Sequence, residues 1–306
     1  MTFTAFRGMK PLSQLLFTAF IAMSAFIVFQ VITGVVAIPL FGFERVSGML
    51  GGPDLTDAGN ISMLKFFQIS QSVSLFVIPS LVAVWLMYEN PWKALHLEKS
   101  VRLVPAMMVL LLIVMVNPFI NFLGGINSAM HFPEWLSGVE DWMRNAEETA
   151  GTLTDAFLKA EGIGGLLFNL LLIAVLPAIG EELLFRGVIQ RILTDLTRNL
   201  HWGIWLSAAL FSALHLQFFG FIPRMVLGAM FGYLLVWSGS LWLPILAHFL
   251  NNAMAVIALY LIDKGSISPA VEEFGNGPEY WYYALPSLFF GILVMWTIRH
   301  QYKNQS

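Results

Sequence analysis

The sequence predicts an all-α fold, a polytopic membrane helix bundle of about eight transmembrane helices with both termini in the cytoplasm. Three observations support this prediction. Of the 306 residues, 58% are hydrophobic and only 11% are charged, whereas about a quarter of the residues in a soluble domain are charged. The mean hydropathy is +0.74. The apolar residues also gather into blocks of about 20 residues, the length that crosses a bilayer as a helix.

Eight apolar blocks follow one another along the chain. The first is too long for the core of a signal peptide and no small-residue cleavage site follows it promptly, so we expect a mature span. Short connections separate the last five blocks, which predicts one compact bundle. The whole chain, residues 1–306, is therefore expected to be a single integral membrane domain. The blocks cover about residues 13–36, 66–88, 103–123, 163–192, 203–219, 222–238, 241–262 and 281–298.

The basic residues predict the orientation, because cytoplasmic segments of membrane proteins are enriched in Lys and Arg. With the N-terminus inside, ten of the sixteen basic residues fall on the cytoplasmic side. We therefore expect a multi-pass protein of the cell (plasma or inner) membrane. The ten are Arg7, Lys10, Lys93, Lys99, Arg102, Arg186, Arg191, Arg198, Arg299 and Lys303.

Two segments outside the membrane have their own character. Residues 41–62 are expected to form an irregular linker. In residues 127–161, Trp135, Val139 and Trp142 recur at helical spacing among acidic residues. This pattern is typical of a helix lying on the membrane interface. The segment serves either as a solvated connector or as a lid over a substrate site.

Composition also limits the partners. There is no basic stripe and no glycine-rich phosphate loop, so no nucleic-acid partner is expected. The absence of cysteine excludes disulfides, thiol catalysis and iron–sulfur clusters.

Gly228 and Gly232 form a GxxxG pair, which predicts close helix packing within the bundle rather than dimerisation. The lipid bilayer is the expected surrounding, and the oligomeric state stays open.

Five ionisable residues inside apolar blocks are the candidates for function, because charges are expensive in hydrocarbon. Glu182 and Arg186 are four residues apart, the spacing of a helical ion pair. Glu181 is rotated by about 100° from Glu182, so it can face a cavity while Glu182 is tied to Arg186. The alternative is that both glutamates are helix-end charges at the cytoplasmic surface. The other two candidates are His215 and His248.

The histidines occur in short patterns of their own. His215 ends the run Phe211-x-x-x-His215, and His248 is followed four residues later by Asn252. A lone histidine on an apolar helix is most often a hydrogen-bonded core residue. Together with the glutamates, however, these residues supply a base, two imidazoles and an amide donor.

Taken in order, Glu181-Glu182-x-x-x-Arg186, Phe211-x-x-x-His215 and His248-x-x-x-Asn252 resemble the three-motif signature of the CAAX protease and bacteriocin-processing family. These are intramembrane proteases related to type II CAAX prenyl endopeptidases. The resemblance covers about residues 163–262, which we expect to be the catalytic core.

The resemblance implies hydrolysis of a peptide bond in a peptide or protein substrate at the membrane. Glu181 would be the general base and His215 would hold or help activate the water. His248 and Asn252 could donate hydrogen bonds to the oxyanion. Glu182, Arg186 and Phe211 would support the site.

Other interpretations stay open on the sequence alone. No cofactor is certain, but Glu181, His215 and His248 could instead be ligands of a divalent metal such as zinc, which would acidify the bound water. A non-cleaving protein for bacteriocin immunity or peptide binding would keep the same motifs. A proton-coupled transporter could use the same groups as a relay, although the internal repeats common in transporters are not seen.

Overall fold

The structure, a computed structural model, describes residues 6–159 and 162–303, with helices and no strand among them. Seven of the helices in these ranges are long and apolar enough to cross a membrane. The protein is therefore a multi-pass membrane helix bundle, which confirms the predicted fold class. The seven are Pro11–Phe41, Ala58–Met87, Leu103–Ser128, Gly162–Thr197, Phe218–Ser238, Trp242–Asp263 and Pro278–Lys303.

The remaining predicted block, 203–219, differs from the expected span. Its helix α11 is Leu200–Ala213, 14 residues long, which corresponds to about 21 Å and is shorter than the roughly 30 Å hydrocarbon core. The chain then turns and enters the 3-10 helix η6, Phe218–Gly220. His215 thus lies in a turn after α11 rather than inside a membrane-crossing helix.

Two of the long helices contain wide π-helical turns. Ala58–Met87 consists of α3 (Ala58–Ser72), η2 (Val73–Val77) and α4 (Ile78–Met87). Gly162–Thr197 consists of α8 (Gly162–Asn169), η4 (Leu170–Val175), α9 (Leu176–Glu182), η5 (Leu183–Ile189) and α10 (Gln190–Thr197). η2 and η4 are each followed within two residues by a proline, Pro79 or Pro177, which has no N–H to donate to the preceding turn.

The other elements are single helices and short connections. α1 is Pro11–Phe41, α6 is Leu103–Ser128, α12 is Phe221–Ser238, α13 is Trp242–Asp263 and α15 is Trp281–Lys303. α7, Ser137–Leu158, is a 22-residue helix outside the set of membrane-crossing helices. The short elements are α2 (Phe43–Gly48), η1 (Met49–Gly51), α5 (Pro91–Ala94), η3 (Glu134–Leu136), α14 (Ala270–Glu273) and η7 (Pro278–Tyr280).

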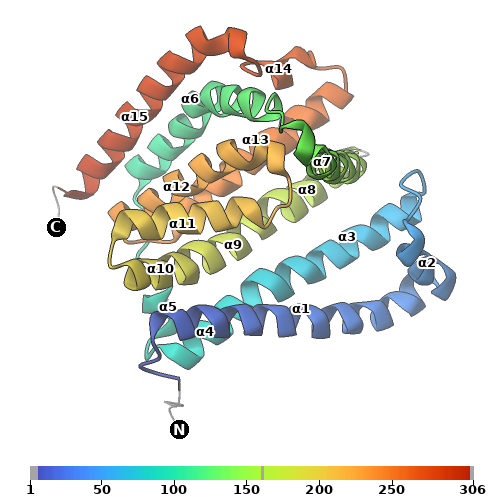
Figure 1. The fold of residues 1–306 in the computed structure, drawn as a ribbon, viewed down its shortest axis with the longest axis horizontal. Coiled ribbons are helices and arrows are strands. Elements are labelled where there is room, and N and C mark those ends of the chain that lie inside the picture. The colour runs from blue at the N-terminus through green and yellow to red at the C-terminus, as the bar shows by residue number, and fades with distance from the viewer. Residues whose placement is uncertain (1–5, 160–161, 304–306) are drawn as a thin grey trace.

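The helices lie in a layered arrangement in which α9 and α10 occupy the middle (Figure 1). α1 packs along α3 and α4 on one side of them, and α6, α12, α13 and α15 pack together on the other. The contact between α6 and α15 includes a polar bridge. Because Pro118 interrupts α6, the Ser287 hydroxyl donates to the Met115 carbonyl (2.6 Å) and accepts from the Phe119 N–H (3.1 Å).

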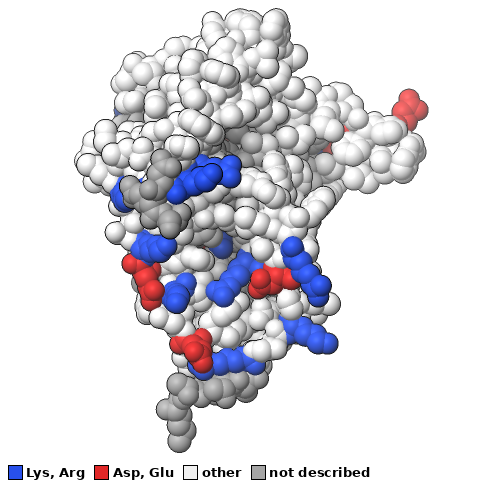
Figure 2. Space-filling model, turned by 90° about the vertical axis from the view of Figure 1, so that its left-hand side faces the viewer, with Lys and Arg blue, Asp and Glu red and all other residues white. Residues whose placement is uncertain are grey.

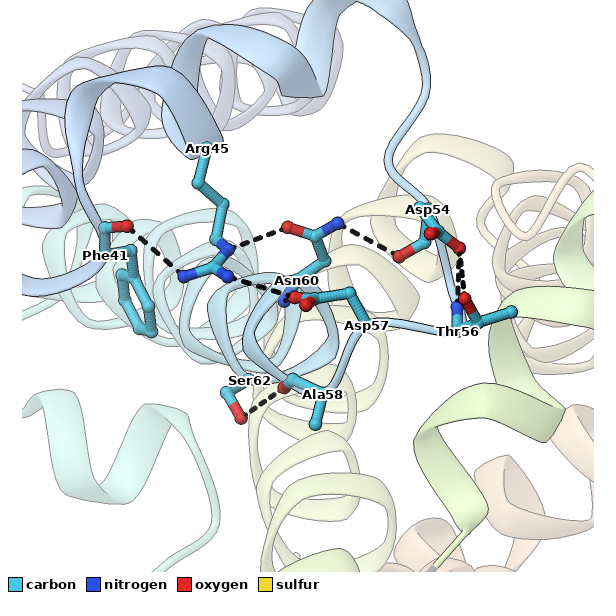
Figure 3. Close-up of polar contacts among 8 residues, drawn as sticks. All are labelled: Phe41, Arg45, Asp54, Thr56, Asp57, Ala58, Asn60 and Ser62. Atoms are coloured by element: carbon cyan, nitrogen blue, oxygen red, sulfur yellow. Dashed lines mark hydrogen bonds and ion pairs between the residues drawn. The ribbon is translucent and has the colours of Figure 1, made fainter.

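The connection from α1 to α3 is more ordered than the irregular linker expected for residues 41–62. Arg45 of α2 donates to the Asn60 side-chain oxygen (3.0 Å), to Asp57 (3.2 Å) and to the Phe41 carbonyl (3.4 Å), as Figure 3 shows. Asp57 also accepts from the Asn60 N–H (2.8 Å) and so caps α3. One guanidinium therefore fastens both helix ends of this turn.

α1 begins and α15 ends at the same end of the bundle (Figure 1). The face at that end carries many Lys and Arg side chains among a few acidic ones (Figure 2). By the enrichment of basic residues in cytoplasmic segments, this end is the one expected to face the cytoplasm. Seven crossings alone would leave the two termini at opposite ends. The short helix α11 packs along α10 and α12 and returns the chain between the fourth and fifth long helices, so both termini lie at this end.

Candidate active site

The two adjacent glutamates end α9, between the wide turns η4 and η5. Glu182 has no solvent exposure and Glu181 is 8% exposed, which differs from the alternative of charges at a helix end on the surface. Short π-helical segments are frequent at functional sites. Gly180, just before the pair, allows close packing, since a Cβ there would lie 3.0 Å from the Phe76 Cβ of η2.

Glu182 joins two partners through a single oxygen. Its Oε1 accepts hydrogen bonds from Nη1 of Arg186 (2.8 Å) and from Nδ1 of His248 (2.8 Å). Arg186 also donates from Nη2 to the Gly228 carbonyl of α12 (3.0 Å). The ion pair that the spacing predicts is therefore present, and it connects the helix of the glutamates to α12 and α13.

Aromatic rings enclose these charged groups. The Arg186 guanidinium carbon lies 4.6 Å from the ring centre of Phe211 and 5.5 Å from that of Phe231. The His248 ring stacks on Phe231, with centroids 5.4 Å apart and planes 25° apart. Such contacts between cations and rings hold a guanidinium in a site that excludes water.

His248 faces both glutamates with different nitrogens. Because Glu182 accepts from Nδ1, that nitrogen carries a proton, and Nε2 is directed toward Glu181, 3.8 Å from its Oε2. This distance is too long for a direct hydrogen bond. Helical geometry therefore divides the two carboxylates. Glu182 holds Arg186, as the spacing predicts, and it also holds His248, which was not expected. Glu181 faces the free side of the imidazole.

His215 lies beside this cluster without a direct bond to it. Its Nδ1 donates to the Phe211 carbonyl (2.8 Å), and its ring meets the Phe211 ring at 4.8 Å. The Phe211 ring is in turn 6.0 Å from that of His248. Within residues 6–159 and 162–303, no hydrogen bond or ion pair joins His215 to Glu181 or His248.

Asn252 is engaged differently from the expected oxyanion donor. Its side-chain amide donates to the Ile173 carbonyl of η4 (3.1 Å), and its oxygen accepts from Asn251 (3.2 Å). Ile173 lies four residues before Pro177, which has no N–H to offer to a carbonyl of the preceding turn. Asn252 therefore donates a hydrogen bond to a carbonyl in the irregular turn before Pro177, and this bond connects α13 to the helix of the glutamates.

The donor set is compatible with a metal in its chemistry. Both histidines donate from Nδ1 to an oxygen, His215 to a carbonyl and His248 to a carboxylate. Metal-ligating histidines commonly make this second bond, which leaves Nε2 free. Over the described part of the chain, no group of three or more His, Asp or Glu side chains lies close enough together to hold a metal ion.

Two residues of the site were not predicted. Phe231 is one of 26 phenylalanines, and no spacing distinguishes it from core residues. Gly228 was expected only as a packing residue of the GxxxG pair, and it also supplies the carbonyl that Arg186 binds. The expected packing within the bundle is present, since a Cβ on Gly228 would lie 3.0 Å from Arg186 and 3.1 Å from the Ala208 Cβ.

The fold and the site thus define a multi-pass membrane protein with a buried carboxylate–imidazole–guanidinium cluster. Residues 163–254 match the family model described as type II CAAX prenyl endopeptidase Rce1-like. The match covers 92 of the 306 residues, and it confirms the resemblance carried by the three motifs. At the level of the family, it supports an intramembrane endopeptidase.

One curated relative is the uncharacterized protein YpbD of Bacillus subtilis (strain 168), which is 31% identical over 90 residues. The match covers 28% of this chain and 43% of the relative, so it spans less than half of either protein. No solved structure matches the chain.

Proposed function

We propose that this protein is an intramembrane endopeptidase that hydrolyses a peptide bond of a membrane-associated or lipidated peptide. One observation carries the proposal: His248 binds Glu182 through Nδ1 and presents Nε2 to Glu181, 3.8 Å away. A water between these two groups can hydrogen-bond to both. The match of the surrounding segment to an endopeptidase family supports the same function.

In the proposed reaction, Glu181 takes a proton from this water while its oxygen attacks the carbonyl carbon of the substrate. The proton then passes to the amide nitrogen as the carbon–nitrogen bond breaks. Glu182 fixes the tautomer and orientation of His248, as a carboxylate does for the histidine of other hydrolases. Arg186 balances the charge of Glu182 within the buried pair.

His215 and Asn252 take the roles implied by the resemblance only after a local change. His215 would turn its free Nε2 to the water, and Asn252 would reach the oxyanion with the amide hydrogen not bound to Ile173. Where a divalent metal such as zinc is bound, Glu181, His215 and His248 would hold it, and the metal would supply an acidified water. The multi-pass fold supports a location in a membrane, and we propose that this is the cell (plasma or inner) membrane.

The test is cleavage of a peptide library by the purified protein in lipid nanodiscs, with metal content measured in parallel. Glu181→Gln keeps the shape of the side chain and removes the base, so cleavage should fall about 100- to 10,000-fold. Glu148→Gln, which changes an exposed glutamate on α7, is the matched control and should cleave normally.

Two results would overturn the proposal. Cleavage that persists in both Glu181→Gln and His215→Ala would contradict the site assignment. A biological activity that survives Glu181→Gln, with no cleavage by the wild type, would favour the non-cleaving immunity or peptide-binding function. Proton-coupled uptake into liposomes would favour the transporter.

A further inference from the structure

A polar cavity lies at the basic end of the bundle, lined by residues other than those of the glutamate cluster. Its volume is about 810 Å³. It opens between the α4–α6 connection, α10 and the turn between α12 and α13. Four of its ten lining residues are basic or imidazole side chains and two are acidic. The lining is Tyr88, Glu89, Asn90, Lys93, Ala94, His96, Glu98, Lys99, Arg191 and Gly239.

Backbone hydrogen bonds hold the walls of this basic cavity in place. The Leu241 N–H donates to the His96 carbonyl (2.9 Å), and the Trp242 indole donates to the Leu97 carbonyl (3.1 Å). Gly239 adopts φ 63°, and a Cβ there would lie 3.1 Å from Lys99 Nζ. Glycine therefore provides the space in which the lysine ammonium enters the cavity.

Each acidic residue that lines the basic cavity has a polar partner, whereas, in the part of the chain that the structure describes, no acidic side chain pairs with the lysines or the arginine of the lining. Glu89 pairs with Arg7 (3.4 Å), and Glu98 accepts from the Asn90 amide (3.0 Å). Among the described residues, Lys93, Lys99 and Arg191 form no ion pair. The three cations therefore favour an anion in the space between them.

Arg191 is held ready for such a ligand. Its guanidinium lies 4.2 Å from the ring centre of Tyr88, and Nη1 donates to the Ala94 carbonyl (3.5 Å). These contacts fix the side chain and leave other N–H groups of the guanidinium uncommitted. A guanidinium and ammonium groups together are the usual protein partners of phosphate oxygens.

Exposed tryptophans place the basic cavity at the level of the lipid headgroups. Trp92 is 60% exposed and Trp242 is 44% exposed. Trp92 precedes the lining residue Lys93, and Trp242 donates to the carbonyl of Leu97, which follows the lining residue His96. Exposed tryptophans mark the membrane–water interface. Basic pockets between transmembrane helices on the cytoplasmic side bind anionic headgroups. The anion nearest to this cavity is therefore a lipid phosphate.

We propose that the basic cavity binds the phosphate group of an anionic phospholipid headgroup, held by Lys93, Lys99 and Arg191. The lipid is a structural ligand that anchors α10 to the loop before α6 and to the turn before α13. This site is separate from the proposed peptidase reaction, and its occupancy does not depend on catalysis.

The experiment is native mass spectrometry of the full chain in detergent, titrated with phosphatidylglycerol, with phosphatidylcholine or with inorganic phosphate. We expect phosphatidylglycerol to bind more tightly than phosphatidylcholine. Lys93→Gln/Lys99→Gln should weaken phosphatidylglycerol binding about 30-fold, from about one fivefold factor per surface cation. Both lysines are exposed, so the variant should unfold at the wild-type temperature.

The matched control is Lys10→Gln/Arg198→Asn, which removes two exposed cations at the same end of the bundle but outside the basic cavity. Its phosphatidylglycerol affinity should change less than threefold. Equal affinities of the two double variants, or equal binding of the two lipids by the wild type, would overturn the proposal. Competition by inorganic phosphate at the same concentration as the lipid would assign the cavity to a soluble phosphate instead.

Discussion

At the scale of single residues, the glutamates are distinguished by what His248 does with its two nitrogens. Oε1 of Glu182 accepts two hydrogen bonds, one from Nδ1 of His248 and one from Nη1 of Arg186. Glu182 is therefore committed to its partners through two charge-assisted hydrogen bonds. Glu181 has only the 3.8 Å approach to Nε2, so it is the carboxylate that is free to exchange a proton with water.

Asn252 gives a prediction that separates support of the fold from catalysis. Asn252→Ala removes the partner of the Ile173 carbonyl, so the free energy of unfolding should fall by about 1–3 kcal/mol. Pro177→Ala restores an N–H four residues after Ile173, and in this background the loss should shrink to less than about half. The measurement is a double-mutant cycle by denaturant unfolding in micelles. Equal losses in the two backgrounds would contradict the role assigned to Asn252.

The sequence predicts part of this site because helical spacing determines which neighbours share a face. Glu182 and Arg186 are four residues apart on one helix, and their pair forms as expected. The positions of His215 and Asn252 depend on where α11 ends and on the defect at Pro177. No periodicity carries this information, because it arises from a turn and from a contact between helices far apart in the sequence.

At the scale of helices, the apolar blocks predict well which helices exist and in what order they follow, but they predict poorly where a helix is locally irregular. Hydrophobic length identifies seven membrane-crossing helices among the described residues, but the wide turns η2, η4 and η5 leave no hydrophobic signature. The 3-10 helix η6, which follows the short helix α11, is held by contacts from α7. Trp142 of α7 packs on Phe218 (5.1 Å between ring centres), and Glu147 accepts from the Phe219 N–H (3.2 Å).

The packing of α12 on its neighbours makes Gly232 sensitive to added volume. A Cβ there would lie 2.6 Å from Oε1 of the buried Gln190 and 2.9 Å from Ile204, so Gly232→Ala should lower the free energy of unfolding by about 1–3 kcal/mol. Gly34→Ala on α1 is the control, because nothing lies within 4 Å of its Cβ position, and alanine there should raise stability by up to about 1 kcal/mol. Denaturant unfolding compares the two, and similar losses would contradict the close packing.

The start of α7 should respond to acid through Glu140. This carboxylate accepts from the Phe132 N–H (2.8 Å) and from Arg144 (2.7 Å), and these bonds lower its pKa to about 2. A carboxyl with a lowered pKa contributes stability above its unfolded pKa of 4.5, and this contribution is lost as the pH falls toward 2. The local structure should therefore be unchanged from pH 7 to 5 and loosen below about 4.5.

Amide exchange of residues 134–144 measures this effect, with Glu140→Gln compared at each pH. The variant should exchange faster than the wild type at neutral pH, and the ratio of the two rates should approach one as the pH nears 2. A ratio that does not change with pH would show that the charge of Glu140 has no part in holding α7.

At the scale of the whole molecule, charge and site position agree on one orientation. The basic face lies at the end where α1 begins and α15 ends (Figures 1 and 2), and α7, with the exposed Trp142, comes after three membrane-crossing helices. Three crossings place α7 on the opposite side from the N-terminus. With the basic end in the cytoplasm, α7 covers the outer side of the turn that carries His215.

Labelling of single cysteines tests this orientation cleanly, because the chain has no cysteine of its own. Glu148→Cys on α7 and Lys10→Cys before α1 are both exposed positions. A membrane-impermeant maleimide should label Glu148→Cys in intact cells, and Lys10→Cys only after permeabilisation, because basic segments are retained in the cytoplasm. The reverse pattern would invert the protein and place α7 in the cytoplasm. Labelling of both positions from one side would mean that one of the three helices between them does not cross the membrane.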